Sequence, residues 1–476
     1  MKKLCLLLVV GFVLVTSTFA FAQVANPDWW REAAAPYAGT VIRGVTESTP
    51  PSMAMRNVAA VEFEELTSIR VELETTSWDE MYSKSIADLQ AGTGLYDFLY
   101  IEQDIIFAYM DQGWLTDLTP YLENEELLYP EFDFDNFTEF VDYFKGEDGN
   151  VFALPFEAFL KSYIYRTDLF GDPDIQAAFE AEYGYPLDVP KYWSEYEDIA
   201  EFFTNYGQEN NLDLYGHVAQ AAVHPALAYE VAGETIFPTW GIYWWGINMD
   251  NHRASVENGG ELNSDLAKEG LEWYIHMLQY APTGVRTYTW DEVAAAIGAG
   301  RVAQGLTYLE NLGWLALDED RSAVVGKLGV GLPPVLNEDV WAEIEAGDGY
   351  IGYYDGGAIG IPAEAENKDA AWLFAQFVTR KEWAPELVRL GTAVVRYSTF
   401  EDPVVQELDE KMGNYFTFMQ EYGKYFYGAP PQPYHLPMVE LYMEWISRAV
   451  AGEVTPSEAL DNLAADFDQM MEDLGY

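Results

Sequence analysis

The chain has 476 residues with 25 basic and 79 acidic side chains, and its formal net charge at pH 7 is −54. So negative a surface repels phosphate backbones and anionic membranes, which argues against nucleic-acid binding. Apolar residues make up 49% of the chain, which excludes disorder, and the length is too great for a single core. We therefore expect a folded protein of two or three domains.

The chain begins MKKLCLLLVVGFVLVTSTFAFA, where two lysines precede an apolar run that ends in small residues. This pattern predicts a secretory signal peptide over residues 1–22, cleaved before Gln23. The single cysteine, Cys5, lies inside the apolar run, so the mature chain has no thiol for disulfides or catalysis. No later segment reaches the ~20 apolar residues that a membrane-spanning helix needs. We expect an unanchored, monomeric protein of the periplasm.

The first part of the mature chain alternates strand and helix patterns. The expected elements are a strand at 39–48, a helix at 56–69, a strand at 70–76, a helix at 79–89 and a strand at 96–104. This alternation predicts a doubly wound parallel sheet, whose ligands bind beyond the carboxyl ends of the strands. The side chains that topology alone places at such a cleft are Glu47, Trp78, Glu102 and Asp104.

The rest of the chain is richer in helices. Residues 155–158 read as an extended crossing that leads into a further strand, and residues 176–282 are mostly helical. Residues 302–308 read as another strand and residues 349–362 as a further crossing. The C-terminal segment is helical again.

In this order the segments resemble the extracellular solute-binding proteins of ATP-driven importers, in the large sugar-binding group that includes maltose-binding protein. The matching stretches are FEELTSIRVEL, LQAGTGLYDFLYI, GWLTDLTPYL, GNVFALPFEAFLKSYIYRTDLF, AAAIGAGRVAQGLTY, AIGIPAEAENKDAAWLFAQFVT, AVVRYSTFEDP and AGEVTPSEALDNL. Each is a weak signal alone, but eight in family order behind a signal peptide are specific. The chain is longer than the smaller family members, and we place the extra length at 120–140, 170–215 and 335–350.

The resemblance implies an α/β fold of two lobes (the type II periplasmic binding protein fold), with doubly wound sheets, three hinge crossings and a helical C-terminus. The crossings would lie near residues 155–158, 303–308 and 353–357. The first lobe would then hold residues 38–155 and 309–353, and the second lobe residues 158–303 and 357–476. The two lobes would close on a ligand between them.

The stretch PTWGIYWWG, residues 238–246, supplies aromatic rings. A sugar offers hydroxyl groups and flatter C–H faces, so its site needs rings to stack on and carboxylates, amides or arginines to hydrogen-bond. If the stretch is helical, Trp240, Tyr243 and Trp244 share one face and Trp245 points elsewhere. The alternative is core packing, since tryptophan is usually mostly buried. We expect a ligand platform on one face and core on the other.

Further candidate ligand contacts lie at the crossings that the resemblance implies. They are Glu157 in the first crossing, Tyr308 and Glu310 at the second, and Tyr354, Asp355 and Gly356 in the third. For Glu157 the alternative is an exposed turn carboxylate, whereas a glycine such as Gly356 lets the backbone approach a ligand closely. Arg396 could donate to ligand oxygens, although for this residue we favour the alternative of a structural ion pair.

No pattern indicates catalysis, a metal or a cofactor. The five histidines show no metal-ligand spacing such as HExxH, and neither a GxSxG nor a GxxxxGK[ST] motif occurs. The acidic run DFDFDN lacks the glycine and the terminal glutamate of a calcium loop. We therefore expect no metal site, no cofactor and no catalytic residues.

The favoured hypothesis is a binding protein, not an enzyme, that captures a carbohydrate by hinge closure and delivers it to the membrane permease subunits of an ABC importer. The aromatic content favours an oligosaccharide. A secreted glycoside hydrolase is the alternative from another class, since two carboxylates flanking a glycosidic bond would suit it. A third hypothesis keeps the fold but changes the ligand to a polyamine or another small solute, which an acidic cleft could hold.

Overall fold

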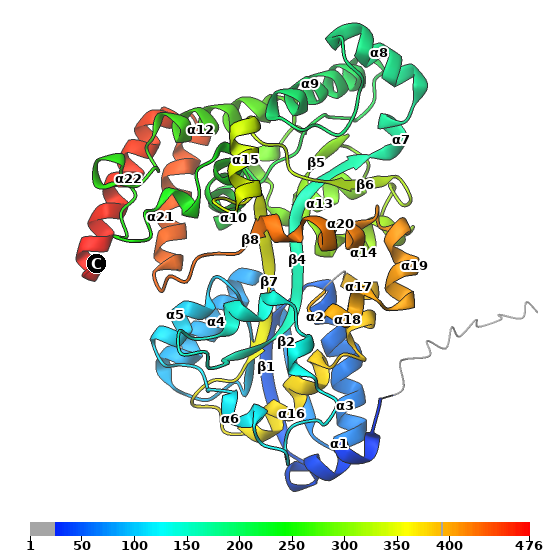
Figure 1. Cartoon of the computed structure of the whole chain (residues 1–476), viewed down its shortest axis with the longest axis vertical. Helices are drawn as coiled ribbons and strands as arrows, with labels where there is room; N and C mark the ends of the chain where they lie inside the picture. The colour runs from blue at the N-terminus through cyan, green and yellow to red at the C-terminus, as the bar shows by residue number, and fades with distance from the viewer. Residues whose placement is uncertain (1–23, 392–393) are drawn as a thin grey trace, which may run out of the picture.

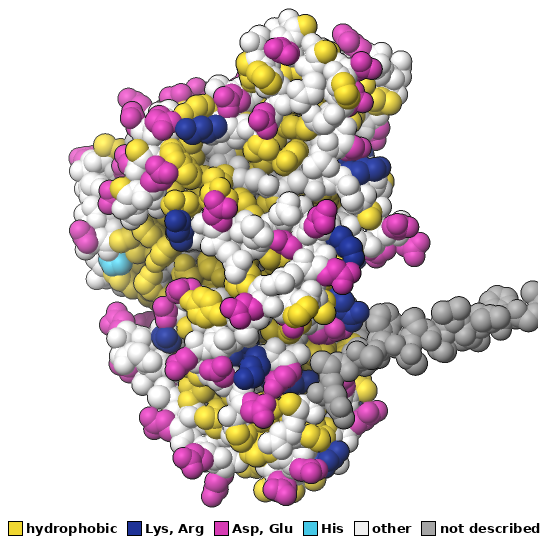
Figure 2. Space-filling model, turned by 45° about the vertical axis from the view of Figure 1, so that its right-hand side comes forward, with side chains coloured by type: hydrophobic (Ala, Val, Ile, Leu, Met, Phe, Trp, Pro, Cys, Tyr) yellow, Lys and Arg dark blue, Asp and Glu magenta, His cyan; other side chains and the backbone are white. Residues whose placement is uncertain are grey.

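The computed structural model describes residues 24–391 and 394–476, so the predicted signal peptide lies outside the described residues. Figure 1 shows two α/β halves, one above the other, joined by long strands that run between them. The N-terminal strands lie in the lower half, and the C-terminal helices lie in the upper half. This two-lobed architecture confirms the fold class expected from the sequence. Acidic side chains are spread over both halves (Figure 2).

The strands form one connected sheet that runs through both halves. They are β1 Val41–Glu47, β2 Arg70–Thr76, β3 Phe98–Glu102, β4 Ala153–Arg166, β5 Gln304–Tyr308, β6 Leu328–Gly331, β7 Gly352–Gly360 and β8 Phe426–Tyr427. Their order is β2-β1-β3-β7-β4-β5, with β6 paired to β4 and β8 paired to β7. β1 pairs in parallel with β2 and β3, as the strand–helix alternation predicts, whereas β7 is antiparallel to both β3 and β4. The parallel part of the sheet therefore ends at β3, and the long strands β7 and β4 continue the sheet in antiparallel order.

Helices cover the sheet in each half. Those of the lower half are α1 Pro27–Ala34, α2 Pro50–Ala54, α3 Ala60–Thr67, α4 Trp78–Ala91, α5 Ile106–Asp111, α6 Thr119–Leu122 and α16 Lys368–Thr379. Near the junction of the halves lie α17 Ala384–Gly391 and α18 Tyr397–Phe400. No helix within the described ranges has the length and apolar character to cross a bilayer.

The upper half contains more helices than the lower one. These are α7 Thr167–Phe170, α8 Pro173–Tyr183, α9 Trp193–Glu209, α10 Pro225–Ala228, α11 Ile236–Trp240, α12 Asp265–Met277, α13 Trp290–Gly298, α14 Leu312–Leu317, α15 Glu338–Ala346, α19 Pro403–Lys411, α20 Tyr415–Tyr422, α21 His435–Val450 and α22 Pro456–Leu474. A π-helical turn, η5 Tyr229–Glu234, joins α10 to α11.

Local sequence signals set where these helices begin and end. The Ser77 hydroxyl accepts the backbone N–H of Glu80 in the first turn of α4, and the helix ends at Gly92, whose φ is +58°. In α22, Thr455 and Glu458 cap each other's backbone N–H groups reciprocally. The helices expected at 56–69 and 79–89 are confirmed, as are the strands at 39–48, 70–76, 96–104 and 302–308.

The structure revises the expected division of the chain between the lobes. Residues 309–353, which the sequence assigned to the first lobe, form α14, β6 and α15 in the upper half, where Leu312 and Ile344 share an apolar cluster with Val293. Residues 358–378 instead pack in the lower core, around Trp372. The reason lies in β5, which pairs only with the upper end of β4 and so does not cross.

Among the described residues, three segments connect the halves. They are β4, β7 and the chain around α17, which contacts both α2 and α14. β4 and β7 pair side by side along the junction, with a register shift between Pro155 and Glu157. At this shift Gly356 has a φ of +130°, and a Cβ there would lie 2.1 Å from the Glu157 carbonyl oxygen. The close pairing of the two crossing strands therefore needs glycine at residue 356.

We predict that Gly356→Ala lowers the free energy of unfolding by about 3 kcal/mol, because the backbone of β4 cannot move away from the added methyl group. Gly347 is the matched control, since it has a φ of +85° with open space around its Cβ position. Gly347→Ala should cost about 1 kcal/mol, which is the backbone term alone. Urea unfolding of the two variants measures both values, and equal losses would contradict this account of the junction.

Candidate functional site

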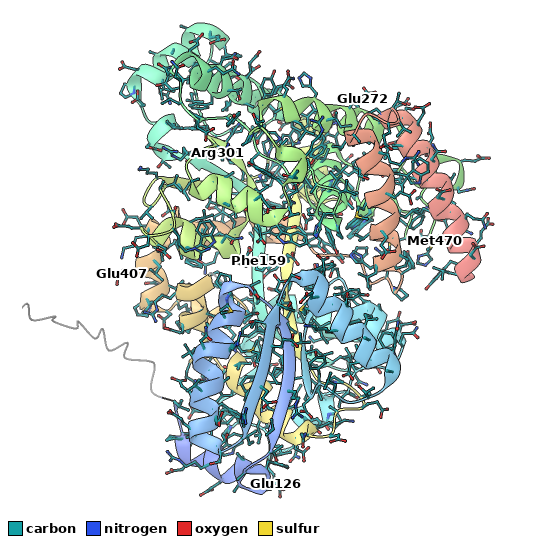
Figure 3. All side chains as sticks on the ribbon, turned by 180° about the vertical axis from the view of Figure 1, so that it is seen from behind. Glu126, Phe159, Glu272, Arg301, Glu407 and Met470 are labelled. Carbon is teal, nitrogen blue, oxygen red and sulfur yellow. The ribbon has the colours of Figure 1, made fainter. Side chains whose placement is uncertain are left out.

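A cavity of ≈ 350 Å³ lies where the two halves meet. Phe159 of β4, which lines it, is seen at the centre of the junction in Figure 3. Glu47 and Glu102 line it from the last residues of β1 and β3, so the carboxyl ends of these parallel strands open into the cavity as their topology predicts. A second, larger groove of ≈ 1290 Å³ lies beside α5, α20 and β8 and shares no lining residue with the cavity.

Carboxyl groups dominate the cavity lining. They are Glu47, Glu102, Asp104, Glu234, Asp291, Glu310 and Asp355. Burial raises the pKa of Glu47 to about 7 and holds the pKa of Glu102, Glu310 and Asp355 well above the usual range. Neighbouring carboxylates raise these pKa values further, because like charges oppose one another's ionisation.

Glu47 and Glu102 form a pair. Their carboxyl groups lie close enough for Glu102 to lower the pKa of Glu47 against the effect of burial, as a proton shared between them would. Glu102 Oε2 also accepts a hydrogen bond from Trp78 Nε1 at 2.6 Å, so the indole of α4 is fixed against the end of β3. The two strand ends therefore place a carboxyl pair and an aromatic ring together on one wall.

Asp104 links the lower half to the upper half. Its Oδ2 accepts a hydrogen bond from the Tyr229 hydroxyl at 2.5 Å and lies 3.1 Å from His435 Nε2 at the start of α21. Burial alone would raise the pKa of Asp104, but His435 and the Tyr229 hydroxyl outweigh it and lower the pKa. This carboxylate is therefore ionised inside the protein and holds the two halves together.

Lys161 of β4 lies beneath the cavity floor and is almost fully buried. Its Nζ pairs with Glu230 and lies 2.8 Å from Glu234 Oε2, and Glu234 also accepts a hydrogen bond from the Tyr308 hydroxyl at 2.6 Å. Burial works to lower the pKa of Lys161, but the two carboxylates outweigh it and raise the pKa. The lysine's charge is thus balanced within this cluster.

Aromatic rings make up most of the remaining lining. They are Trp78, Tyr100, Phe159, Tyr229, Trp290, Tyr308 and Trp314. Trp78 of the lower half meets Trp290 of the upper half edge to face, with ring centroids 6.0 Å apart. Beside them the His224 ring packs against the Trp290 ring, with centroids 4.8 Å apart. His224 Nε2 lies 3.4 Å from Asp79 Oδ2. These contacts join the halves at one side of the cavity.

The structure brings half of the sequence-predicted site residues to the cavity. Those that line it are Glu47, Trp78, Glu102, Asp104, Tyr308, Glu310 and Asp355. Their role as ligand contacts stays a prediction. The first four lie at or just beyond strand or helix ends of the lower half, and Asp355 lies on the crossing strand β7. Tyr308 and Glu310 lie at the end of β5, which does not cross.

The tryptophan-rich stretch does not reach the cavity. Helix α11 ends at Trp240, because Gly241 has a φ of +85°, so Trp240, Tyr243 and Trp244 do not share a helical face. Trp240 packs in the core against Trp193 and Trp273. Tyr243 donates a hydrogen bond to a Glu343 carboxylate, and Trp244 packs edge to face on Tyr427. The expected platform is thus replaced by core packing and outer contacts of the upper half.

Four further candidates also lie away from the cavity lining. Glu157 is fully buried beneath it, where Oε2 accepts a hydrogen bond from Thr49 at 3.3 Å. Tyr354 lines the larger groove instead, because neighbouring residues of a strand face opposite sides. Gly356 packs against the backbone of β4. Arg396 donates to the carbonyl oxygens of residues 379 and 133 and forms no ion pair with any described residue, which supports a structural role through backbone carbonyls.

Sequence reasoning missed part of the lining. Tyr229 and Glu234 come from η5, and the sequence YEVAGE gives no sign that the helix widens there to a π-turn. Asp291, on the rim, follows Trp290 in the first turn of α13. Within the described ranges no set of three or more His, Cys, Asp or Glu side chains is placed to hold a metal ion.

Comparison with known proteins places the chain among transport proteins. A family model described as bacterial extracellular solute-binding protein matches residues 59–411. An erythritol/L-threitol-binding protein of Mycolicibacterium smegmatis is 24% identical over 420 residues, which cover 83% of this chain and 78% of that protein.

Solved structures show the same fold. A solute-binding protein of an ABC transporter from Agrobacterium radiobacter, in complex with ribitol, has a TM-score of 0.73 at 22% identity, covering 91% of this chain and 99% of that one. A maltose-bound protein from T. maritima has a TM-score of 0.71 at 17% identity, covering 90% and 100%. These likenesses establish the two-lobed architecture and leave the ligand to be argued from the cavity.

Because folding raises the pKa of Glu47 to about 7 from the value near 4.3 of an unfolded chain, the native state holds its proton more tightly. The resulting stability is complete below about pH 4.5 and is lost as the pH rises through 7. We predict that Glu47→Gln becomes more stable relative to the wild type by on the order of 2 kcal/mol between pH 5 and pH 8. Urea unfolding across this range measures the difference, with exposed Glu126→Gln as the control. A difference that does not change with pH would contradict the site electrostatics.

Proposed function

Because the chain belongs to the bacterial extracellular solute-binding protein family, we propose that it captures a carbohydrate between its two lobes and delivers it to the permease subunits of an ABC importer. The proposal places it in the periplasm or outside the cell, acting as a monomer. The observation that carries it is the cavity lining, in which carboxylates can accept hydrogen bonds from hydroxyl groups and aromatic rings can pack on C–H faces.

The relatives support a polyhydroxylated ligand. The Mycolicibacterium smegmatis protein is named for erythritol and L-threitol, and the Agrobacterium radiobacter and T. maritima structures hold ribitol and maltose. The cavity of ≈ 350 Å³ lies near the lower end of the roughly 300–1,000 Å³ of ligand pockets. Its size therefore favours a small sugar or polyol over the oligosaccharide that the aromatic content suggested.

The mechanism that we propose is closure of the two halves over the ligand. Two pairs meet across the junction, Trp78 with Trp290 and Asp104 with Tyr229. Closure of the two halves would bring these pairs into contact. A ligand that contacts both halves binds the closed form better than the open form, and this difference in affinity drives the motion. β4 and β7 would flex while they keep the halves paired.

We propose that no chemical step follows binding. A glycoside hydrolase would use two of the cavity carboxyls, one as an acid with a raised pKa, and Glu102 or Glu310 would suit that role. The membership in a family of solute-binding proteins favours capture and release. Chromatography of the bound sugar distinguishes hydrolysis from binding. A hydrolase would leave shortened products, whereas a binding protein would return the sugar intact.

We predict that a thermal-shift screen of the mature protein raises Tm with a small sugar or polyol, because a bound ligand stabilises the folded state. Trp290→Ala should then raise the Kd of that ligand about tenfold in calorimetric titration, since an aromatic wall of the cavity is lost. Trp445→Ala is the control, because Trp445 lies on α21 outside the cavity lining. The absence of any shift across mono- and disaccharides and polyols would overturn the proposed function.

A further inference from the structure

We propose that the ligand of this cavity is a sugar or polyol that carries a primary ammonium group, bound by carboxylates for which the described residues offer no cationic partner. The inference rests on the proposed function above and names its substrate class. Three features of the cavity support it, namely its charge balance, its unpartnered oxygens and its aromatic walls.

The charges of the cavity do not balance within the described residues. Lys161 already pairs with Glu230 and Glu234, and His435 lies against Asp104. Arg321 is exposed at the edge and stacks over the Trp314 ring at 4.4 Å from its centroid, in no ion pair. The carboxyls left without a cation in the described part of the chain are Glu47, Glu102, Glu310, Asp355 and the rim residue Asp291.

Two carboxyl oxygens of the lining are buried and accept no hydrogen bond. Asp104 is only 2% exposed, and its Oδ1 has no partner although its Oδ2 has three. Glu310 Oε1 accepts from the Asn311 side chain at 2.6 Å, but Glu310 Oε2 accepts nothing. A buried acceptor without a donor is costly, so both oxygens point to donors supplied by a ligand. An ammonium group offers three donors and no acceptor.

The aromatic walls suit a cation as well as a sugar ring. Trp78, Trp290 and Trp314 face the same space as the uncompensated carboxyls, and the faces of indole rings attract positive charge. A neutral polyol would leave these buried carboxyls protonated, whereas an ammonium group would favour their ionised form and pair with it. A ligand with one ammonium group gains this pairing while its hydroxyl groups occupy the remaining acceptors.

The test uses pairs of ligands that differ in one group. The mature protein is titrated calorimetrically at pH 7 with D-glucitol and 1-amino-1-deoxy-D-glucitol, with glucose and glucosamine, and with galactose and galactosamine. The amino group of each amino member is mostly protonated at this pH, as an α-amino group is. We expect the amino member of at least one pair to bind ten times or more tighter than its hydroxyl partner.

Two isosteric variants place the effect in the cavity. Glu310→Gln and Asp355→Asn each keep the shape and one carbonyl acceptor but remove the carboxylate that an ammonium group would pair with, so each should weaken the amino ligand about ten times more than the hydroxyl ligand. Glu126→Gln, at the far end of the lower half (Figure 3), is the matched control and should change neither. If a variant fails to fold, the ligand pairs on the wild-type protein still decide the question.

Equal or tighter binding of every hydroxyl member would overturn the inference and leave the proposed function standing. Binding of putrescine without binding of any amino sugar would overturn the inference and the carbohydrate assignment together. Failure of every sugar, polyol and amino derivative to bind would overturn both as well. Tighter amino binding that is lost in Glu310→Gln and kept in Glu126→Gln would support the inference.

Discussion

The crowding of carboxyl groups between the two halves is the constraint on which the rest of this structure depends. Seven carboxyl side chains line a cavity of ≈ 350 Å³, and so many like charges cannot all be ionised together in a buried space. The protein relieves part of this repulsion through Lys161 beneath the floor, His435 beside Asp104 and a proton that Glu47 and Glu102 can share. The carboxyl groups that have no such partner are free to accept hydrogen bonds from a ligand.

The fold places these groups together because strands from both halves end or cross at one junction. β1 and β3 deliver Glu47 and Glu102 at their carboxyl ends, and the crossing strand β7 delivers Asp355. β4 and β7 remain paired through the junction, where only glycine fits at residue 356. In the closure that we propose, the halves would change their separation about these two paired strands while the cavity keeps one wall in each half.

The sequence predicted a residue's position correctly where that position depends on a single strand or helix. The alternation of strands and helices predicted β1, β2 and β3 to within two residues at each end, and with them the positions of Glu47 and Glu102. It was misleading for Trp240, because one glycine ended α11 and turned the following aromatics elsewhere. Glu234 was missed because a π-turn is not visible in residue periodicity.

The division between the lobes was mispredicted for a similar reason. The strand at residues 302–308 exists, but only its pairing shows that β5 stays beside the upper end of β4 and does not cross. Strand pairing between distant segments is a tertiary property, and one sequence without its relatives does not contain it. The same limit hid Tyr229, whose hydroxyl meets Asp104 from the other half of the molecule.

The most direct test of this account is a crystal structure of the protein with the tightest ligand found by titration. The account predicts the ligand in the cavity between β1, β3 and β7, with ligand donors on Asp104 Oδ1 and Glu310 Oε2. A ligand seated instead in the larger groove beside α5 and α20, with those two oxygens still unpartnered, would contradict it.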